Sequence, residues 1–141
     1  MDNLFLLRDL FDVCKLYDID IGIISLDQEK AFDRVDHFFL FSTLRAFGFG
    51  QGFISLVGLL YNEVFCVVKV GGGLSCPVKI QRGIRQGCPI SGQLYSVAIE
   101  PLLHKVRSTL TGILLPGLSH RPALVVSDYA DDLNFFYHSS R

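Results

Sequence analysis

Two adjacent carboxylates, Asp131 and Asp132, interrupt an apolar stretch near the end of the chain, SDYADDLNFF over residues 127–136. The segments ALVVS before them and LNFFY after them are rich in β-branched and aromatic residues, which is typical of strands. A short connection between two such runs predicts a hairpin with the carboxylates at its tip. Because neighbouring like charges repel and lose hydration when buried, something should compensate them, and a divalent cation is one candidate.

A third carboxylate has to come from another element if this pair is to hold catalytic metal ions. Two-metal phosphoryl transfer needs carboxylates from separate elements around two ions about 3.5 to 4 Å apart. Asp27 ends IGIISLD, an apolar, β-branched run typical of a central strand. Asp33 and Asp36 fall where a helix begins, and there a carboxylate has an ordinary role as a cap. We therefore assign Asp27 to the cluster, with a plain strand-end residue as the alternative.

The rest of the pattern predicts an α+β fold. Apolar residues recur at helical spacing in four segments, which predicts helices over residues 3–17, 36–47, 53–60 and 91–107. Pro101 removes a backbone hydrogen bond from the last of these and predicts a kink. VFCVVKV and PVKI predict two strands around a glycine turn. The order of elements is typical of a small, mostly antiparallel sheet packed against helices.

Length and composition indicate one domain. The 141 residues suffice for one hydrophobic core and are too few for two comfortable ones, so residues 1–141 are expected to form a single, partial domain. The net charge of −1 gives no overall attraction to nucleic acid, so nucleic-acid binding has to come from a local site. The four cysteines and four histidines show no metal-ligand spacing, which predicts core thiols in a reducing compartment.

Nothing in the sequence predicts a membrane segment. No stretch reaches about 18 consecutive apolar residues, the length a membrane span requires. The N-terminal MDNLFLLRDLFDVC has acidic residues where a signal peptide has basic ones. We therefore expect no membrane contact and an intracellular protein, in the cytoplasm or the nucleus.

Three segments, in order, resemble the palm motifs of reverse transcriptases of LINE-type (non-LTR) retrotransposons. They are SLDQEKAFDRVDH, RGIRQGCPISGQLYSVAIEPL and YADD. A lone YADD is a weak signal, whereas three ordered motifs with the first at a strand end are a specific one. The resemblance implies a polymerase palm whose fingers and thumb are largely missing, and which belongs to a longer polyprotein.

The same resemblance implies a two-metal site. It implies that Asp27 and Asp131 bridge two Mg²⁺ ions, that Asp132 completes the acidic cluster and that the backbone carbonyl of Gln28 adds a ligand. Mg²⁺, with Mn²⁺ as the alternative, suits hard oxygen ligands and substrate phosphates. The implied reaction is attack of a DNA primer 3′-hydroxyl on the α-phosphate of a dNTP, directed by an RNA template.

The motifs also imply which residues meet the nucleotide. Phe32 matches the aromatic residue that stacks under the incoming sugar and excludes a 2′-hydroxyl; without the motif it would be one more core residue among 12 phenylalanines. Gln86 and Gly87 match a pair that lies against the nascent base pair, where glycine permits close approach and the amide offers a donor and an acceptor. Arg85 is expected to meet phosphate or template backbone.

Some features remain open on sequence alone. Lys30, Arg82 and Asp128 lie beside the motifs without an assigned role, and Ser91-Gly92 stands where the family usually has Ser-Pro at the start of the last helix. Two functions compete: an active RNA-directed DNA polymerase fragment, and a catalytically inactive retroelement remnant with residual nucleic-acid or protein binding. A metal site of some unrelated enzyme is a third, which the middle motif argues against.

Overall fold

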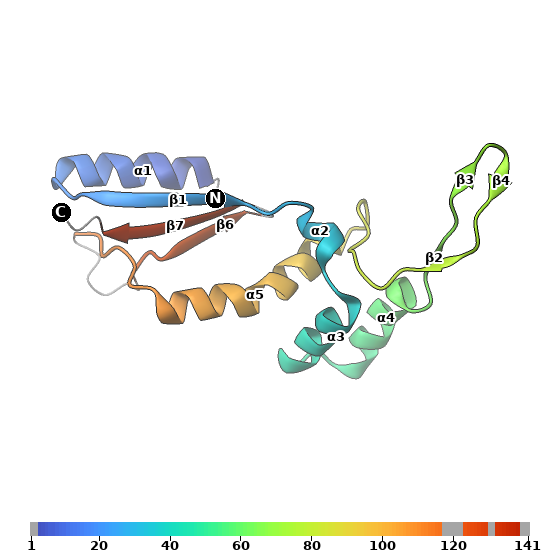
Figure 1. Ribbon diagram of the computed structural model, residues 1–141. Coiled ribbons are helices and arrows are strands. Elements are labelled where there is room, and N and C mark those ends of the chain that lie inside the picture. The colour runs from blue at the N-terminus through green and yellow to red at the C-terminus, as the bar shows by residue number, and fades with distance from the viewer. Residues whose placement is uncertain (1–2, 117–122, 130–131, 139–141) are drawn as a thin grey trace. The chain divides into compact units, whose positions relative to one another are not determined.

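A computed structural model describes residues 3–116, 123–129 and 132–138 of the chain (Figure 1). The chain divides into two compact units, one of residues 1–29 with 100–141 and the other of residues 30–99. Helices and small antiparallel sheets occur together, which confirms the expected α+β class. The expectation of a single domain stays a prediction.

The first unit is built on an antiparallel sheet with the strand order β1-β7-β6. Its strands are β1 (Ile21–Asp27), β6 (Val126–Tyr129) and β7 (Asp132–His138). The expected hairpin is therefore confirmed, and its connection, Ala130 and Asp131, lies outside the described residues. The expectation that β1 is a central strand is wrong among the described strands, where it lies at the end of the order.

The position of β1 has a physical explanation in the exposure of its two faces. One face packs in the core of the unit through Ile21 and Ile23. On the other face, Ile24 and Leu26 are each 48% exposed. Apolar residues on both faces thus suggested a central strand, although among the described residues only one face of β1 is well covered.

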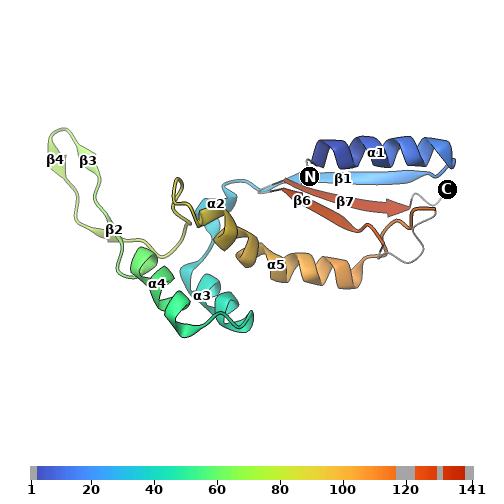
Figure 2. The same ribbon diagram turned by 180° about the vertical axis from the view of Figure 1, so that it is seen from behind.

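Helix α1 (Asn3–Leu16) packs on the sheet through Leu10 and Cys14, which form a core cluster with Phe136 of β7. Because side chains alternate along a strand, Phe136 and its ladder partner Ile23 lie on the face that meets α1. The C-terminal turns of α5 run along the opposite face, as both views of the ribbon show (Figures 1 and 2). The sheet of this unit therefore lies between two helices.

The second unit contains three helices near its start. They are α2 (Ala31–Arg34), α3 (His37–Ala46) and α4 (Gln51–Tyr61). The sequence predicted the last two, and α2 was not expected because four residues are too few to show a helical period. Fully buried side chains of α3 and α4 form much of its core, among them Leu40, Leu44 and Val57.

Helix α3 begins at a side-chain cap. Asp36 is its N-cap residue, and its carboxylate accepts a hydrogen bond of 3.0 Å from the backbone N–H of Phe39. Such a bond satisfies one of the backbone donors left free at a helix start. The ordinary role expected of Asp36 is therefore confirmed.

An extended hairpin follows α4. Strands β2 (Phe65–Cys66) and β5 (Val78–Lys79) pair near its base, and β3 (Lys69–Val70) and β4 (Gly73–Leu74) pair near its tip. The tip is Gly71-Gly72, with φ of 56° and 85°. Two consecutive positive φ angles match a turn whose twist suits a two-residue hairpin, and glycine adopts them without strain.

The last helix, α5 (Ser91–Thr109), begins in the second unit and ends in the first. Its bounds agree with the helix expected over residues 91–107, and Pro101 lies inside it. The kink expected at Pro101 stays a prediction. No helix in the described part of the chain is long and apolar enough to cross a membrane.

The four cysteines differ in exposure, so the expectation of core thiols holds only in part. Cys14 is buried, Cys88 is partly buried, and Cys66 and Cys76 are exposed on the hairpin. The hairpin strands carry apolar residues without a covering layer among the described residues, which is why their sequence suggested burial. Burial also raises the pKa of the Cys14 thiol above its ordinary value.

Alkylation should separate these thiols. With iodoacetamide at about pH 8, we expect Cys66 and Cys76 to be modified first and Cys14 last, because the thiolate is the reactive form and burial disfavours it. Peptide mass spectrometry over time measures the order in which the cysteines are modified, and early modification of Cys14 would contradict its burial.

The raised pKa of Cys14 also affects stability. Because the unfolded chain ionises Cys14 at lower pH than the folded chain does, the contribution of Cys14 to the free energy of unfolding decreases as the pH rises above the ordinary pKa of a thiol.

Gly112 tests the packing of the first unit. A Cβ added there would lie 2.6 Å from the carbonyl carbon of Leu124 and 2.7 Å from a methyl group of Val125. We expect Gly112→Ala to lower the free energy of unfolding by about 1 to 3 kcal/mol, because backbone has to move. Gly52→Ala in α4 is the matched control, since nothing lies within 4 Å of its Cβ, and it should be neutral or stabilising. Urea denaturation of both variants is the measurement; equal stabilities would contradict the prediction.

Candidate functional site

Asp27 and Asp132 lie directly opposite each other in the ladder between β1 and β7. Asp27 is the last residue of β1 and Asp132 is the first of β7. Directly opposite residues of an antiparallel pair project from the same face, with Cβ atoms about 4.5 to 5.5 Å apart. Both residues are exposed. Two carboxylates from separate strands therefore lie side by side at one end of the sheet.

Strand alternation also fixes the face that the pair occupies. Asp27 is four residues after Ile23, and Asp132 is four before Phe136, so all four residues project from one face. The apolar members of this row pack against α1, and the acidic members continue the row to the end of the ladder. The same register that builds the core thus brings the two carboxylates together.

The pair has no compensating charge within the described part of the chain. None of the ion pairs there includes Asp27 or Asp132. Like charges directly opposite each other in a ladder are destabilising. Carboxylate oxygens are the hard donors that Mg²⁺ and Mn²⁺ prefer, so the donor set fits a divalent cation of this kind.

A complete metal centre needs more donors than these two. Among the described residues, no three histidine, cysteine, aspartate or glutamate side chains gather as a metal site. Asp131, the third carboxylate that the sequence implicated, lies outside the described residues. Gln28 follows β1 and is partly buried, and the metal-binding role of its backbone carbonyl stays a prediction.

Asp128 belongs to a different environment from the acidic pair. It is opposite Leu133, so its side chain projects from the other face of the sheet. There it lies 3.6 Å from Arg107 of α5, whose guanidinium also contacts Glu100 at 2.7 Å. Asp128 therefore connects β6 to α5, which gives a structural role to an acid that the sequence left without one.

Three residues implicated in nucleotide binding line one pocket in the second unit. Phe32, Gln86 and Gly87 surround a volume of about 440 Å³. The other lining residues are Cys88, Ser91 and Gly92. The structure thus brings together residues that are more than 50 positions apart in sequence, and their roles toward the nucleotide stay predictions.

Backbone hydrogen bonds hold this loop against α2. The N–H of Ile84 donates to the carbonyl of Phe32 at 2.8 Å, and the N–H of Gly83 donates to the carbonyl of Val35, also at 2.8 Å. Gly83 has a φ of 97°, a conformation that favours glycine. The segment before Gln86 is therefore fixed to the helix that carries Phe32.

The peptide groups of Arg85 are held from two helices. Its N–H donates to the hydroxyl oxygen of Tyr61 of α4 at 3.4 Å, and its carbonyl accepts a short hydrogen bond from the hydroxyl of Ser91. Its side chain is exposed, and contact with phosphate or template stays a prediction. Sequence reasoning missed Tyr61, because a contact between residues 24 positions apart leaves no local pattern.

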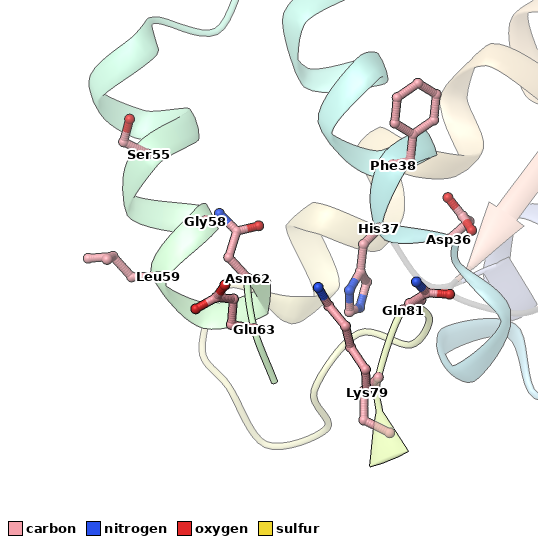
Figure 3. Close-up of a pocket in the computed structure, with 11 residues that line it drawn as sticks. Asp36, His37, Phe38, Ser55, Gly58, Leu59, Asn62, Glu63, Lys79 and Gln81 are labelled. Atoms are coloured by element: carbon pink, nitrogen blue, oxygen red, sulfur yellow. The ribbon is translucent and has the colours of Figure 1, made fainter. Parts of the chain in front are cut away.

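A larger pocket lies nearby, between the start of α3, the end of α4 and the segment after β5 (Figure 3). Its volume is about 880 Å³ and its lining is mostly polar, with Asn62, Glu63 and Lys79 among the side chains. His37 also lines it, and its Nε2 atom is 2.9 Å from the carbonyl oxygen of Gly83. Asp36 and His37 of the first motif line this pocket, but none of the described residues assigned to metal or nucleotide binding does.

Arg82 and Lys30 now have structural positions. Arg82 lies 3.7 Å from the Asp36 carboxylate, in an exposed ion pair of small energetic value. Lys30 precedes α2 in a left-handed conformation, and its carbonyl accepts the N–H groups of Asp33 and Arg34. Both residues therefore take part in local structure.

The predicted site residues fall into two groups. Asp27 and Asp132 are in the first unit, and Phe32, Arg85 and the Gln86-Gly87 pair are in the second. Each group has a defined arrangement within its own unit. A carboxylate at a strand end, a hairpin whose second strand begins with another, and a Gln-Gly loop before a helix are the features that the resemblance to a polymerase palm led us to expect.

Comparison with known proteins gives this assignment a family. The chain belongs to the reverse transcriptase (RNA-dependent DNA polymerase) family, whose model matches residues 4–141. It is 48% identical over 132 residues to the Transposon TX1 uncharacterized 149 kDa protein of Xenopus laevis, a match that covers 94% of this chain and 10% of that protein. The resemblance to LINE-type reverse transcriptases is therefore confirmed.

Two further relatives are Pol polyproteins of R2 elements. The chain is 28% identical over 133 residues to the retrovirus-related Pol polyprotein from type-1 retrotransposable element R2 of Popillia japonica, covering 93% of this chain and 21% of that protein. It is 31% identical over 114 residues to the retrovirus-related Pol polyprotein from type-2 retrotransposable element R2DM of Drosophila melanogaster. This match covers 81% of this chain and 10% of that protein. The chain spans between a tenth and about a fifth of the length of these curated relatives.

Proposed function

We propose that this chain is the catalytic palm segment of an RNA-directed DNA polymerase, which adds dNTPs to the 3′-hydroxyl of a DNA primer on an RNA template. The observation that carries the proposal is the register that places Asp27 opposite Asp132. Two exposed carboxylates, without an ion pair among the described residues, cost stability unless a cation or substrate uses them. Membership of the reverse transcriptase family supplies the reaction class.

Asp27, Asp131 and Asp132 would hold two Mg²⁺ ions, or Mn²⁺, with the carbonyl of Gln28 as a further ligand. When bound, such ions activate the attacking hydroxyl and neutralise charge on the leaving pyrophosphate. The protein contributes position, because β1 and β7 fix two of the carboxylates in register before any ligand arrives. A preformed pair requires little rearrangement during the reaction.

The second unit would bind the nucleotide. In this proposal Phe32 stacks under the sugar and excludes a 2′-hydroxyl, Gln86 and Gly87 lie against the nascent base pair, and Arg85 contacts phosphate or template. The shared pocket of Phe32, Gln86 and Gly87 supports this grouping. As in its relatives, the segment would act within a longer polyprotein that supplies fingers and thumb, in the cytoplasm or the nucleus, with residues 1–141 as one partial palm domain.

Primer extension tests the proposal. The purified chain is incubated with a DNA primer on an RNA template, dNTPs and Mg²⁺, and we expect extension that stops when EDTA is added. Binding to the primer-template should weaken as salt rises, because contacts to phosphate release counterions. Absence of extension at every salt concentration would contradict catalysis by this chain and favour the inactive remnant, with any salt-dependent binding as its residual function.

A further inference from the structure

The ring of Phe32 stacks on the ring of Tyr95. Their centroids are 4.5 Å apart and their planes differ by 23°. Tyr95 is 3% exposed and belongs to the core cluster of the second unit, whereas Phe32 packs against that cluster from outside. Phe32 also lines the pocket with Gln86 and Gly87, so the same residue borders the pocket and stacks on a buried aromatic ring.

Tyr95 itself has little freedom to move. It lies in the first turns of α5 beside the buried residues Leu94 and Ala98. Ser91, one helical turn earlier on the same face, binds the carbonyl of Arg85. The same face of α5 therefore holds both the loop before Gln86 and the ring behind Phe32.

The backbone of Phe32 is fixed as well. Its carbonyl accepts the N–H of Ile84, which is 2% exposed. With the backbone held, the ring can move mainly by rotation about its own side-chain bonds, and the stacked Tyr95 blocks part of that rotation. The contact with Tyr95 thus restricts the positions that the Phe32 ring can take.

We propose that Tyr95 is a positioning residue that sets the reach of Phe32 into the nucleotide pocket and thereby the discrimination against a 2′-hydroxyl. The proposal rests on the proposed function of Phe32. A side chain excludes a single hydroxyl group only if it cannot yield, and packed interiors resist such displacement. Aromatic stacking adds attraction beyond the buried area, so the pair is held together as well as confined.

Fluorescence tests the positioning without polymerase activity. The chain contains no tryptophan, so Phe32→Trp introduces a single reporter at the pocket. With Tyr95→Leu in this background, we expect the acrylamide quenching constant to increase about twofold, because the stacking partner is lost and the ring gains freedom. Tyr95→Phe keeps the ring and should leave quenching unchanged. Unchanged quenching with Tyr95→Leu would overturn the proposal.

Single-nucleotide incorporation tests the specificity. The ratio of kcat/KM for dATP over ATP should fall about two- to tenfold in Tyr95→Leu and be retained in Tyr95→Phe. The lower ratio should result from a higher kcat/KM for ATP. In a Phe32→Ala background, Tyr95→Leu should cause no further fall, because its effect acts through the ring that is already absent. An additive effect in the double variant would show that Tyr95 does not act through Phe32.

Two controls separate positioning from simple destabilisation. Val57→Ala removes a buried side chain from the same core and should lower the melting temperature while the dATP-to-ATP ratio is retained. If the ratio fell equally in Val57→Ala and in Tyr95→Leu, the effect of Tyr95 would be that of any core residue and the proposal would be wrong. Absence of extension by the unmodified chain would contradict the proposed function, whereas the quenching experiment would still decide whether Tyr95 holds residue 32.

Discussion

Replacing Asp27 with asparagine should reduce Mg²⁺-dependent primer extension at least about a hundredfold, the scale of losing a preorganised group that stabilises transition-state charge. The variant keeps the size and shape of the side chain and removes its charge. It should also lose any increase in melting temperature that Mg²⁺ or Mn²⁺ gives the unmodified chain. Asp131→Asn is expected to behave in the same way.

In the absence of metal, the same substitution should increase the stability of the protein. Because Asp27 and Asp132 are directly opposite in the ladder, Asp27→Asn relieves a repulsion and should raise the free energy of unfolding by about 0.2 to 1 kcal/mol. We thus expect Asp27→Asn to be more stable without metal, to show no change of melting temperature with metal, and to lose primer extension. Misfolding would not explain this combination, because a misfolded variant would be less stable. Calorimetry with and without MgCl₂ measures the first two properties.

Asp128→Asn is the matched control. It makes the same chemical change in the same sheet, but Asp128 projects from the opposite face and pairs with Arg107. We expect this variant to keep both extension and the response to Mg²⁺. Equal stabilisation of Asp27→Asn and the unmodified chain by Mg²⁺ would rule out a metal site at the acidic pair.

Truncating Phe136 to alanine should lower the free energy of unfolding of the first unit by about 3 to 5 kcal/mol, the usual cost of removing a buried aromatic ring. Phe136 is 1% exposed and packs with Leu10 and Cys14 of α1. Leu10 and Cys14 are held in a helix, and Ile113, the other buried member of the cluster, is held by two backbone hydrogen bonds to Leu124, so the volume should not be readily refilled. Urea denaturation followed by circular dichroism measures the loss.

Phe11→Ala provides the comparison within the same unit. Phe11 is in α1 but is 48% exposed, so its truncation removes less buried surface. Alanine also has a higher helix propensity, and the net loss should stay below about 1 kcal/mol. If both variants lost the same stability, the core of this unit would not be organised around Phe136.

The sequence predicted the elements whose signal is local. In helices α1, α3, α4 and α5, apolar residues recur with a period of about 3.6 residues over ten or more positions. This period differs from the two-residue period of a strand, so it indicates a helix. The β6–β7 hairpin followed from two apolar runs separated by a short polar one. The acidic pair followed from Asp27 at a strand end together with the family resemblance, and the ladder now gives that pair a register.

Features that depend on distant contacts left no such signal. The position of β1 at the end of the strand order depends on which strands pair with it, and its apolar residues do not specify those partners. The sequence analysis assigned no role to Tyr61 or Tyr95, and only the fold shows that they contact Arg85 and Phe32. Helix α2 is too short to show a period of its own.

The register of β7 also limits how this strand can change in evolution. Asp132 and Phe136 lie four positions apart, an even number, so the acid and the core ring share one face. Inserting or deleting one residue between them would turn either the acid or the ring to the wrong side. Selection for a folded protein therefore also preserves the arrangement of the acidic pair. The length of this segment is therefore constrained in addition to the identity of Asp132 and Phe136.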